Sequence, residues 1–216
     1  MTNVEQQNVT SQTKGLVLHG SAHYYDLLAW LVMRGREGEF RKKVVELACL
    51  ETGERVLDVG CGTGTLAITA KRRLGPTGTI YGIDPSPEMI TRATKKAKKA
   101  GVEVVFKEAI VEALPFADEY FDAVLSTLML HHLPAKARED CALEMRRVLK
   151  PGGRVLVVDF GSSPKKKGLV GRLHRRHGFV KLDDIINVLT QVGLNIGESG
   201  AVGLKGMHFV LATASK

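Results

Sequence analysis

The feature that most constrains this fold is a short apolar segment that runs directly into a glycine-rich turn. Residues 55–59 read RVLDV, and glycines follow at Gly60, Gly62 and Gly64 before a helical pattern over 65–74. Glycines in such a turn let the backbone approach a ligand closely, because side chains at those positions would block it. The N–H groups at the start of the following helix then face the ligand. The sequence therefore predicts a strand–turn–helix unit that carries a ligand site.

The rest of the chain repeats this alternation of strands and helices. We expect strands at 55–59, 79–84, 102–107, 121–127, 154–160, 194–201 and 207–213, and helices at 24–34, 37–50, 65–74, 85–99, 135–149 and 182–192. Ser86 is the expected N-cap of its helix, with Pro87 in the first turn. Alternating units of this kind form parallel sheets with helices on both faces. The predicted fold class is therefore α/β: a Rossmann-like, doubly wound, mostly parallel seven-stranded sheet with a C-terminal antiparallel hairpin strand.

The chain length of 216 residues fits one domain with a full-sized core. We expect a disordered polar tail over 1–14, a helical lid over 15–52 and a ligand-binding domain over 53–216. Within that domain, 161–181 is predicted to be a basic insertion that covers the substrate.

Composition limits where the chain works and what it binds. Three widely spaced cysteines give neither a disulfide framework nor the spacing of a zinc site, and we expect no metal. The N-terminus lacks the apolar core of a secretory signal, and no apolar run is long enough to span a membrane. We therefore expect a cytoplasmic protein, with peripheral attachment to a membrane as an alternative. The net charge of +8 permits a nucleic acid, an anionic membrane or an acidic substrate as partner, or simply a basic solvated surface.

Two details of the glycine turn separate the candidate ligands. The dinucleotide fingerprint is G-x-G-x-x-G, and its third glycine would fall at Thr65. A carboxylate at Asp58 would repel a pyrophosphate, whereas it suits a ligand whose nearby end carries an ammonium and a sulfonium. The turn therefore favours S-adenosylmethionine over NAD.

A second acid ends the next predicted strand. Asp84 lies twenty residues after Gly64, and an acid at this position can accept two hydrogen bonds from ribose hydroxyls. The alternative is that Asp84 caps the following helix. Together with the glycine turn, ribose binding is the favoured interpretation.

Several motifs in order resemble a known family. VLDVGCGTG, GIDPSPEMI, LPFADEYFDAV, HHLP and RVLKPGGRVLVVDF resemble the class I S-adenosylmethionine-dependent methyltransferases, from about Tyr24 to the C-terminus. The similarity is greatest to the ubiquinone/menaquinone C-methyltransferase-like branch, often labelled methyltransferase type 11. Under this resemblance Asp58 anchors the methionine amino group and Asp84 holds the ribose diol. The full set of implied cofactor contacts is Asp58, Gly60, Cys61, Gly62, Gly64, Asp84, Pro85, Met89, Ile110, Val111 and Ser126.

One position departs from the family pattern. The resembling proteins read Gly-Asp-Ala just before the Leu-Pro-Phe motif, and their Asp accepts from the adenine amino group. Here Ile110 takes the Asp position and Val111 follows it. We therefore expect apolar packing and the Val111 N–H to hold the adenine, with Pro85 or Met89 packed on the ring. Glu108 is an alternative acceptor if the loop shifts.

The end of the strand over 121–127 is the predicted acceptor site. Methyl transfer from a sulfonium mainly needs in-line placement of the acceptor, and a base only if the acceptor must lose a proton. Met129 and His131 follow this strand, and His131 is the candidate base because histidine titrates near neutral pH. Tyr24 and Tyr25 are further candidate substrate contacts that the resemblance implies. The alternatives are a capping or packing role for the histidine and ordinary helix docking for the aromatics.

The segment 164–177, PKKKGLVGRLHRRH, is the most distinctive part of the chain. It holds six Lys/Arg and no acid, and apolar residues interleave with the charges. Such a segment suits an anionic membrane surface that carries a lipid-like substrate, an anionic substrate, or a solvated basic loop. The same segment and the closing hairpin are compatible with a homodimer.

Three functions fit these patterns. The first is a methyltransferase that acts on a small-molecule acceptor of quinone, phenol or lipid type. The second is a nucleic-acid methyltransferase, prompted by the positive charge but disfavoured because Ser126–Met129 stands where Asn/Asp-Pro-Pro-Tyr/Phe would be. The third is a non-catalytic protein that binds S-adenosylmethionine. An NAD-dependent oxidoreductase is excluded by the glycine spacing.

Overall fold

The computed structural model describes residues 35–161, 180–203 and 206–215. The elements are, in chain order, α2 (Glu37–Leu47), β1 (Arg55–Val59), α3 (Thr65–Leu74), β2 (Thr79–Asp84), α4 (Pro87–Ala100), β3 (Val105–Glu108), β4 (Phe121–Thr127), the 3₁₀ helix η1 (Leu130–His132), α5 (Ala135–Val148), β5 (Leu149–Phe160), α7 (Leu182–Gln191), β6 (Leu194–Ala201) and β7 (Met207–Ala214).

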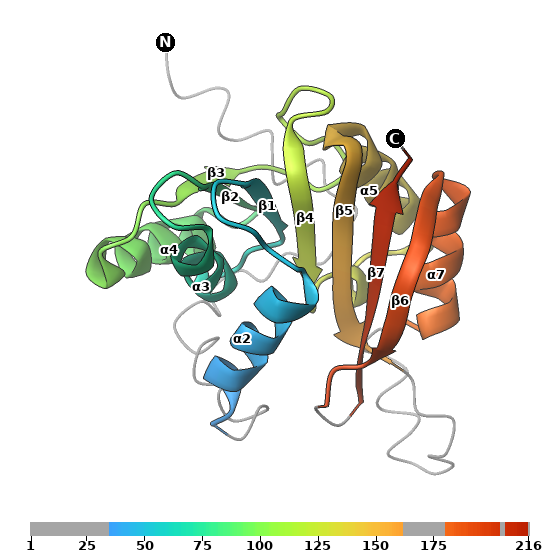
Figure 1. Cartoon of the computed structure of the whole chain (residues 1–216), viewed down its shortest axis with the longest axis horizontal. Helices are drawn as coiled ribbons and strands as arrows, with labels where there is room; N and C mark the ends of the chain where they lie inside the picture. Colours follow the sequence, from blue (N-terminus) through green and yellow to red (C-terminus); the bar gives the residue numbers. More distant parts are fainter. Residues whose placement is uncertain (1–34, 162–179, 204–205, 216) are drawn as a thin grey trace.

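The strands form one seven-stranded sheet in the order β3-β2-β1-β4-β5-β7-β6 (Figure 1). The first five are parallel, and β7 pairs antiparallel with both β5 and β6. The predicted Rossmann-like sheet and its closing hairpin are confirmed. The chain order reverses between β1 and β4, and doubly wound sheets bind ligands beyond the carboxyl ends of the strands at this point.

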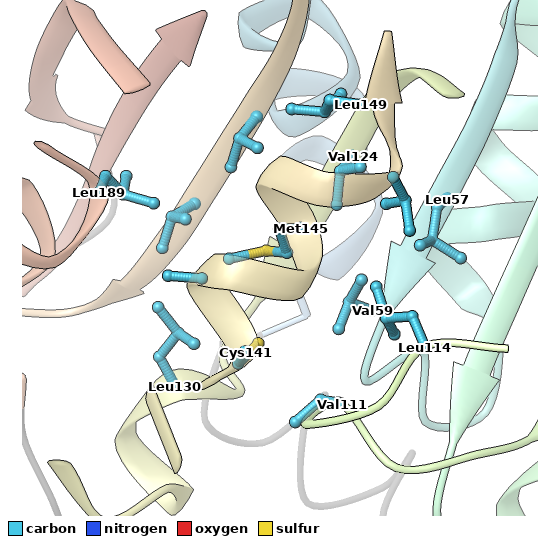
Figure 2. Packing of buried hydrophobic residues seen from close by; sticks show 14 of the residues in the cluster. Leu57, Val59, Val111, Leu114, Val124, Leu130, Cys141, Met145, Leu149 and Leu189 are labelled. Carbon is cyan, nitrogen blue, oxygen red and sulfur yellow. The ribbon is translucent and has the colours of Figure 1, made fainter. Parts of the chain in front are cut away.

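Two apolar clusters cover the two faces of the sheet. One cluster combines Val56 of β1 and Leu125 of β4 with residues of α2 and α3. The other combines Leu57 of β1 with α5 and α7, and Figure 2 shows Cys141 and Met145 of α5 within it. Strands buried on both faces are nearly continuous in apolar residues, which is why their positions could be read from the sequence.

Element ends differ from prediction where the backbone turns. Strand β3 begins at Val105 rather than at Val102, because Gly101 takes a left-handed conformation and the Val102 N–H closes the end of α4 on Ala97. Strand β5 begins at Leu149 rather than at residue 154. A shift in the pairing with β4 accommodates the Lys-Pro-Gly-Gly stretch within it.

The start of α4 and the end of α2 also differ slightly. Helix α4 begins at Pro87 rather than Pro85, and the predicted N-cap is confirmed because the Ser86 hydroxyl accepts from the Met89 N–H. Helix α2 ends at Leu47, because the chain turns at Cys49, whose φ is +50°.

The predicted division into lid and domain stays a prediction. Helix α2 packs into the core through Phe40 and Val44. The rest of the predicted lid, the predicted tail over 1–14 and most of the insertion over 161–181 lie outside the described residues.

Candidate cofactor and acceptor site

The glycine turn is the structural centre of the site. Gly60, Gly62 and Gly64 have φ of +72°, +51° and +75°, the left-handed region that favours glycine. A Cβ on Gly60 would collide with Cγ of Met129, and one on Gly64 would lie 2.9 Å from Cβ of Ala93. The glycines therefore permit both the turn itself and its close packing against the loop after β4 and against α4.

Asp58 lies directly before this turn and is 1% exposed. Neither of its carboxylate oxygens has a hydrogen-bond partner of normal geometry among the described residues. Burial raises the pKa of Asp58 to about 7; the charge of Arg41 opposes this rise, the charge of Asp84 adds to it, and the Ala67 N–H opposes it weakly. A buried carboxylate without a partner is costly, and a cationic ligand group would satisfy it.

Asp84 lies on the other side of the turn and braces it. Its Oδ2 accepts from the Gly62 N–H at 3.0 Å, and its Oδ1 accepts from the Ser86 N–H at 3.0 Å. Burial raises the pKa of Asp84, and these two N–H groups oppose the rise. Each oxygen keeps acceptor capacity, so ribose binding stays compatible with this bracing role.

Arg41 was not among the predicted site residues. It extends from α2, is 8% exposed, and donates from Nη1 to the Thr127 hydroxyl at 3.4 Å. Its Nη2 lies 3.5 Å from Glu37, and its Nε has no partner among the residues that the structure describes. The spacing of Glu37 and Arg41 is that of an exposed helix pair, so only the packing of α2 on the sheet could reveal a buried cation beside Asp58.

The loop after β4 carries the predicted acceptor residues. Leu128 has φ of +54°, and its N–H donates to Val158 as the chain leaves the sheet. Met129 then packs on Gly60, and Nδ1 of His131 lies 2.6 Å from Oδ1 of Asp159. Asp159, at the end of β5, is a second residue that the prediction missed.

Ser126 lies one residue before the end of β4, in register with Val59. It is fully buried, and its hydroxyl has no partner within the described part of the chain. Because side chains alternate along a strand, Ser126 points to the opposite face of the sheet from Asp58. Its role as a cofactor contact stays a prediction.

Comparison with known proteins places this site in a family. The family model described as "Methyltransferase domain" matches residues 56–153. The demethylmenaquinone methyltransferase of Thermus thermophilus is 40% identical over 151 residues, which cover 70% of this chain and 66% of that protein. A ubiquinone/menaquinone biosynthesis C-methyltransferase of Pseudomonas fluorescens is 34% identical over 165 residues, covering 76% of this chain and 63% of that protein. The structure of a SAM dependent methyltransferase from Aquifex aeolicus is 27% identical, with a TM-score of 0.68 over 87% of this chain and 97% of that one.

This chain belongs to the class I S-adenosylmethionine-dependent methyltransferases. It spans slightly less than two thirds of the length of the curated relatives it matches, at 66% and 63%. The sheet order and the strand–turn–helix unit agree with the family resemblance read from the sequence.

As a class I methyltransferase, this chain has an unusual loop where the family reads Gly-Asp-Ala. Val111 is buried in the core, near Leu114 and Val59 in Figure 2, and Ile110 is half-buried. The loop is fixed to β2 by the Ala109 N–H, which donates to the Asp84 carbonyl at 3.2 Å. An apolar adenine contact at this loop stays a prediction.

Helix α5 holds the other end of that loop. Glu144 accepts from the Leu114 N–H at 2.7 Å, and Arg147 donates to the carbonyls of Leu114 and Phe116. Of the two other predicted adenine contacts, Met89 on α4 is buried, and Pro85, which lies between β2 and α4, is half-exposed.

Some predicted features cannot be placed in this methyltransferase. Tyr24, Tyr25 and the basic segment over 164–177 lie outside the described residues. Among residues 35–161, 180–203 and 206–215, no group of three or more His, Cys, Asp or Glu is arranged to hold a metal ion. Within the same ranges, no helix has the length and apolar character needed to cross a membrane.

Proposed function

We propose that this chain binds S-adenosylmethionine at the carboxyl ends of β1 and β2 and transfers its methyl group to a small-molecule acceptor of quinone, phenol or lipid type. The observation that carries the proposal is Asp58, a buried carboxylate beside a turn of three glycines, whose two oxygens have no hydrogen-bond partner of normal geometry among the described residues. The names of the relatives, a demethylmenaquinone methyltransferase and a ubiquinone/menaquinone C-methyltransferase, support a quinone-type acceptor.

The charged residues of the site suggest how the methionine part and the ribose of the cofactor would be held. Asp58 would take the methionine ammonium, and Asp84 would accept from the ribose hydroxyls. Arg41, whose guanidinium is buried and only partly satisfied, would take the methionine carboxylate. A buried acid and a buried cation whose charges interact match a ligand end that carries both an ammonium and a carboxylate. NAD has no such end, and Asp58 would repel its pyrophosphate.

The other proposed cofactor contacts are Gly60, Cys61, Gly62, Gly64, Pro85, Met89, Ile110, Val111 and Ser126. Bound there, S-adenosylmethionine supplies a methyl group on a positively charged sulfur. The chain's own task is to orient the acceptor and to exclude water from it.

The acceptor would lie beyond the end of β4, against Met129 and His131, with Tyr24 and Tyr25 as further proposed contacts. An anionic membrane surface at 164–177, a homodimer and a cytoplasmic location are parts of the same proposal. The first two rest on the basic segment and the closing hairpin, the location rests on the cysteine pattern and the composition of the N-terminus, and each needs its own test.

Calorimetry tests the cofactor. S-adenosylmethionine and S-adenosylhomocysteine should both bind, and NAD should not. Asp84→Ala should weaken binding ten- to a hundredfold, on the order of 1.5–3 kcal/mol for lost charge-assisted hydrogen bonds. Binding of NAD without either sulfur ligand would overturn the proposal, and an unchanged affinity of the Asp84 variant would remove that residue from the site.

Transfer of a labelled methyl group tests the acceptor. A panel of reduced naphthoquinones, simple phenols and lipid head groups should include at least one substrate, whereas tRNA and duplex DNA should take no label. Labelled nucleic acid would favour the second function that the sequence left open. Tight cofactor binding with no transfer to any class would favour a non-catalytic protein.

A further inference from the structure

We propose that His131 and Asp159 form a proton-accepting dyad in which Asp159 positions His131 to take the proton of an acceptor hydroxyl. We call the two residues the His131–Asp159 dyad. The inference rests on the proposed function, and it deepens that function by defining the acceptor as one that must lose a proton when it is methylated. His131 would be the catalytic residue of the pair, and Asp159 the positioning residue.

The hydrogen bonds of Asp159 fix the tautomer of His131. Asp159 is 1% exposed, and its Oδ1 accepts from the Phe160 N–H at 2.7 Å. Its Oδ2 accepts from the backbone N–H of His131 at 3.1 Å, and its Oδ1 also lies 2.6 Å from Nδ1 of the His131 ring. A carboxylate that already takes two N–H groups acts as an acceptor, so Nδ1 donates the third bond. In neutral His131 the lone pair is then on Nε2, the form a general base requires.

The ring of His131 is held from three sides. Besides Asp159, the Phe160 ring meets it edge-on with centroids 5.5 Å apart, and the His132 ring lies 3.9 Å away. The His131 side chain is 12% exposed, and its Nε2 makes no hydrogen bond to any residue that the structure describes. One ring nitrogen is therefore oriented by a buried acid while the other stays available.

The adjacent His132 does not compete for the same proton near neutral pH. Burial, and then the adjacent His131, lower the pKa of His132 to about 4, so its ring stays neutral. His208 on β7 is in register with Asp159 on β5. The Nδ1 atom of His208 is buried against Gly161 and has no hydrogen-bond partner among the described residues.

The position of the dyad relates it to the methyl-donor site. Met129, two residues before His131, contacts Gly60 of the glycine turn. Thr127 and Val158 are paired at the carboxyl ends of β4 and β5, directly before the two halves of the dyad. The strained turn at Leu128, a non-glycine residue with φ of +54°, directs the chain from the sheet toward this position. The dyad thus lies at the edge of the sheet where the cofactor would present its methyl group.

The step balances with one proton released for each methyl group transferred. The acceptor O–H bond breaks, its proton goes to Nε2 of His131, and its electron pair stays on the acceptor. That pair forms the new bond to the methyl carbon, at the oxygen or through a conjugated ring at the adjacent carbon, while the carbon–sulfur bond breaks and leaves its pair on sulfur. When the ring carbon is methylated, that carbon then loses its own proton to water, which is the one proton released, and the oxygen regains its proton from His131. The acceptor class is therefore a hydroxyl-bearing aromatic ring, and the step consumes no oxidant or reductant.

Steady-state kinetics with a hydroxyl acceptor tests the pair. His131→Asn should lower kcat by about 10²–10⁴-fold, the usual effect of losing a general base, with KM within threefold. Asp159→Asn should lower kcat about tenfold or more, again without a matching change in KM. A phenol whose electron-withdrawing substituent keeps it ionised at the assay pH should be methylated by both variants at nearly the wild-type rate. Asp122→Asn is the matched control, because Asp122 is an acid at the opposite end of β4 whose loss should leave kcat unchanged.

Nitrogen-15 NMR of the histidine rings gives a readout that does not depend on turnover. Wild-type His131 should show a protonated Nδ1 and an unprotonated Nε2, and Asp159→Asn should disturb this pattern. Unchanged kcat in both variants with an un-ionised acceptor, or equal loss with ionised and un-ionised acceptors, would overturn the dyad.

Binding of S-adenosylhomocysteine separates the two proposals. Wild-type affinity in both variants is expected and shows an intact fold and cofactor site. Failure of the wild-type chain to bind S-adenosylhomocysteine would overturn the proposed function, and the catalytic role of the dyad with it.

Discussion

The pH dependence of cofactor affinity follows from the burial of Asp58. Desolvation raises the pKa of this carboxyl from 3.8 to about 7, and the nearby charge of Asp84 contributes to the rise. The ammonium of S-adenosylmethionine or S-adenosylhomocysteine needs the ionised form. Cys61, the other titratable group in the turn, keeps its proton because burial raises its pKa well above 9.0. Affinity should therefore be limited at low pH by the fraction of Asp58 that is ionised.

The magnitude follows from that pKa. With a value of about 7, the dissociation constant of S-adenosylhomocysteine should be about eightfold weaker at pH 6.0 than at pH 7.5. Near pH 7 about half a proton should be released for each ligand bound, because the bound ammonium keeps Asp58 ionised. The pKa of Asp84 is also raised, so its titration would change the affinity in the same direction.

Isothermal titration calorimetry in buffers of different ionisation enthalpy measures both quantities. Asp58→Asn is the control, because it removes the titrating group and reports any titration of the ligand itself. The variant should bind more weakly and should lose most of the pH dependence. Equal wild-type affinities at pH 6.0 and 7.5, with no proton release, would refute the argument that Asp58 receives the ammonium.

The remaining predictions concern stability. A pKa raised from 3.8 to about 7 means that the ligand-free protein loses stability as pH rises through this window, by on the order of 4 kcal/mol in full. Asp58→Asn should therefore raise the free energy of unfolding of the ligand-free protein at pH 8 by about 1–3 kcal/mol, less than the full amount because the amide would also lack a partner. The melting temperature should rise with it, and a lower melting temperature would contradict this. Gly64→Ala should cost about 2–4 kcal/mol in urea denaturation, because its Cβ meets Ala93 at 2.9 Å and φ is +75°, whereas Gly101→Ala, with φ of +65° and open space, should cost only about 1 kcal/mol. Equal costs for the two glycines would show that the turn is loosely packed. Arg154→Ala removes four hydrogen bonds that join β5 to a glutamate and to two carbonyls after α2, so it should cost about 1–3 kcal/mol. The exposed Arg36→Ala should be nearly neutral in the same assay.

The sequence by itself determined the strands, their parallel arrangement and the position of the glycine turn. The physical reason is local, because a buried parallel strand is nearly continuous in apolar residues and a left-handed turn selects glycine. Strands β1, β2, β4 and β6 and helix α3 begin and end where the pattern predicted. The two acids of the turn were also predicted from local sequence, because each lies at the carboxyl end of an apolar strand.

Only the tertiary structure decided which distant residues come together. Arg41 lies seventeen positions before Asp58 in the sequence, and His131 lies twenty-eight before Asp159. Neither pairing has a local signal, because each depends on how a helix packs on the sheet or on which strands are neighbours. The protonation of Asp58 is likewise set by burial and by charges from other elements, and no sequence pattern encodes these. A sequence thus specifies the elements, whereas the electrostatics of a site arise when those elements pack.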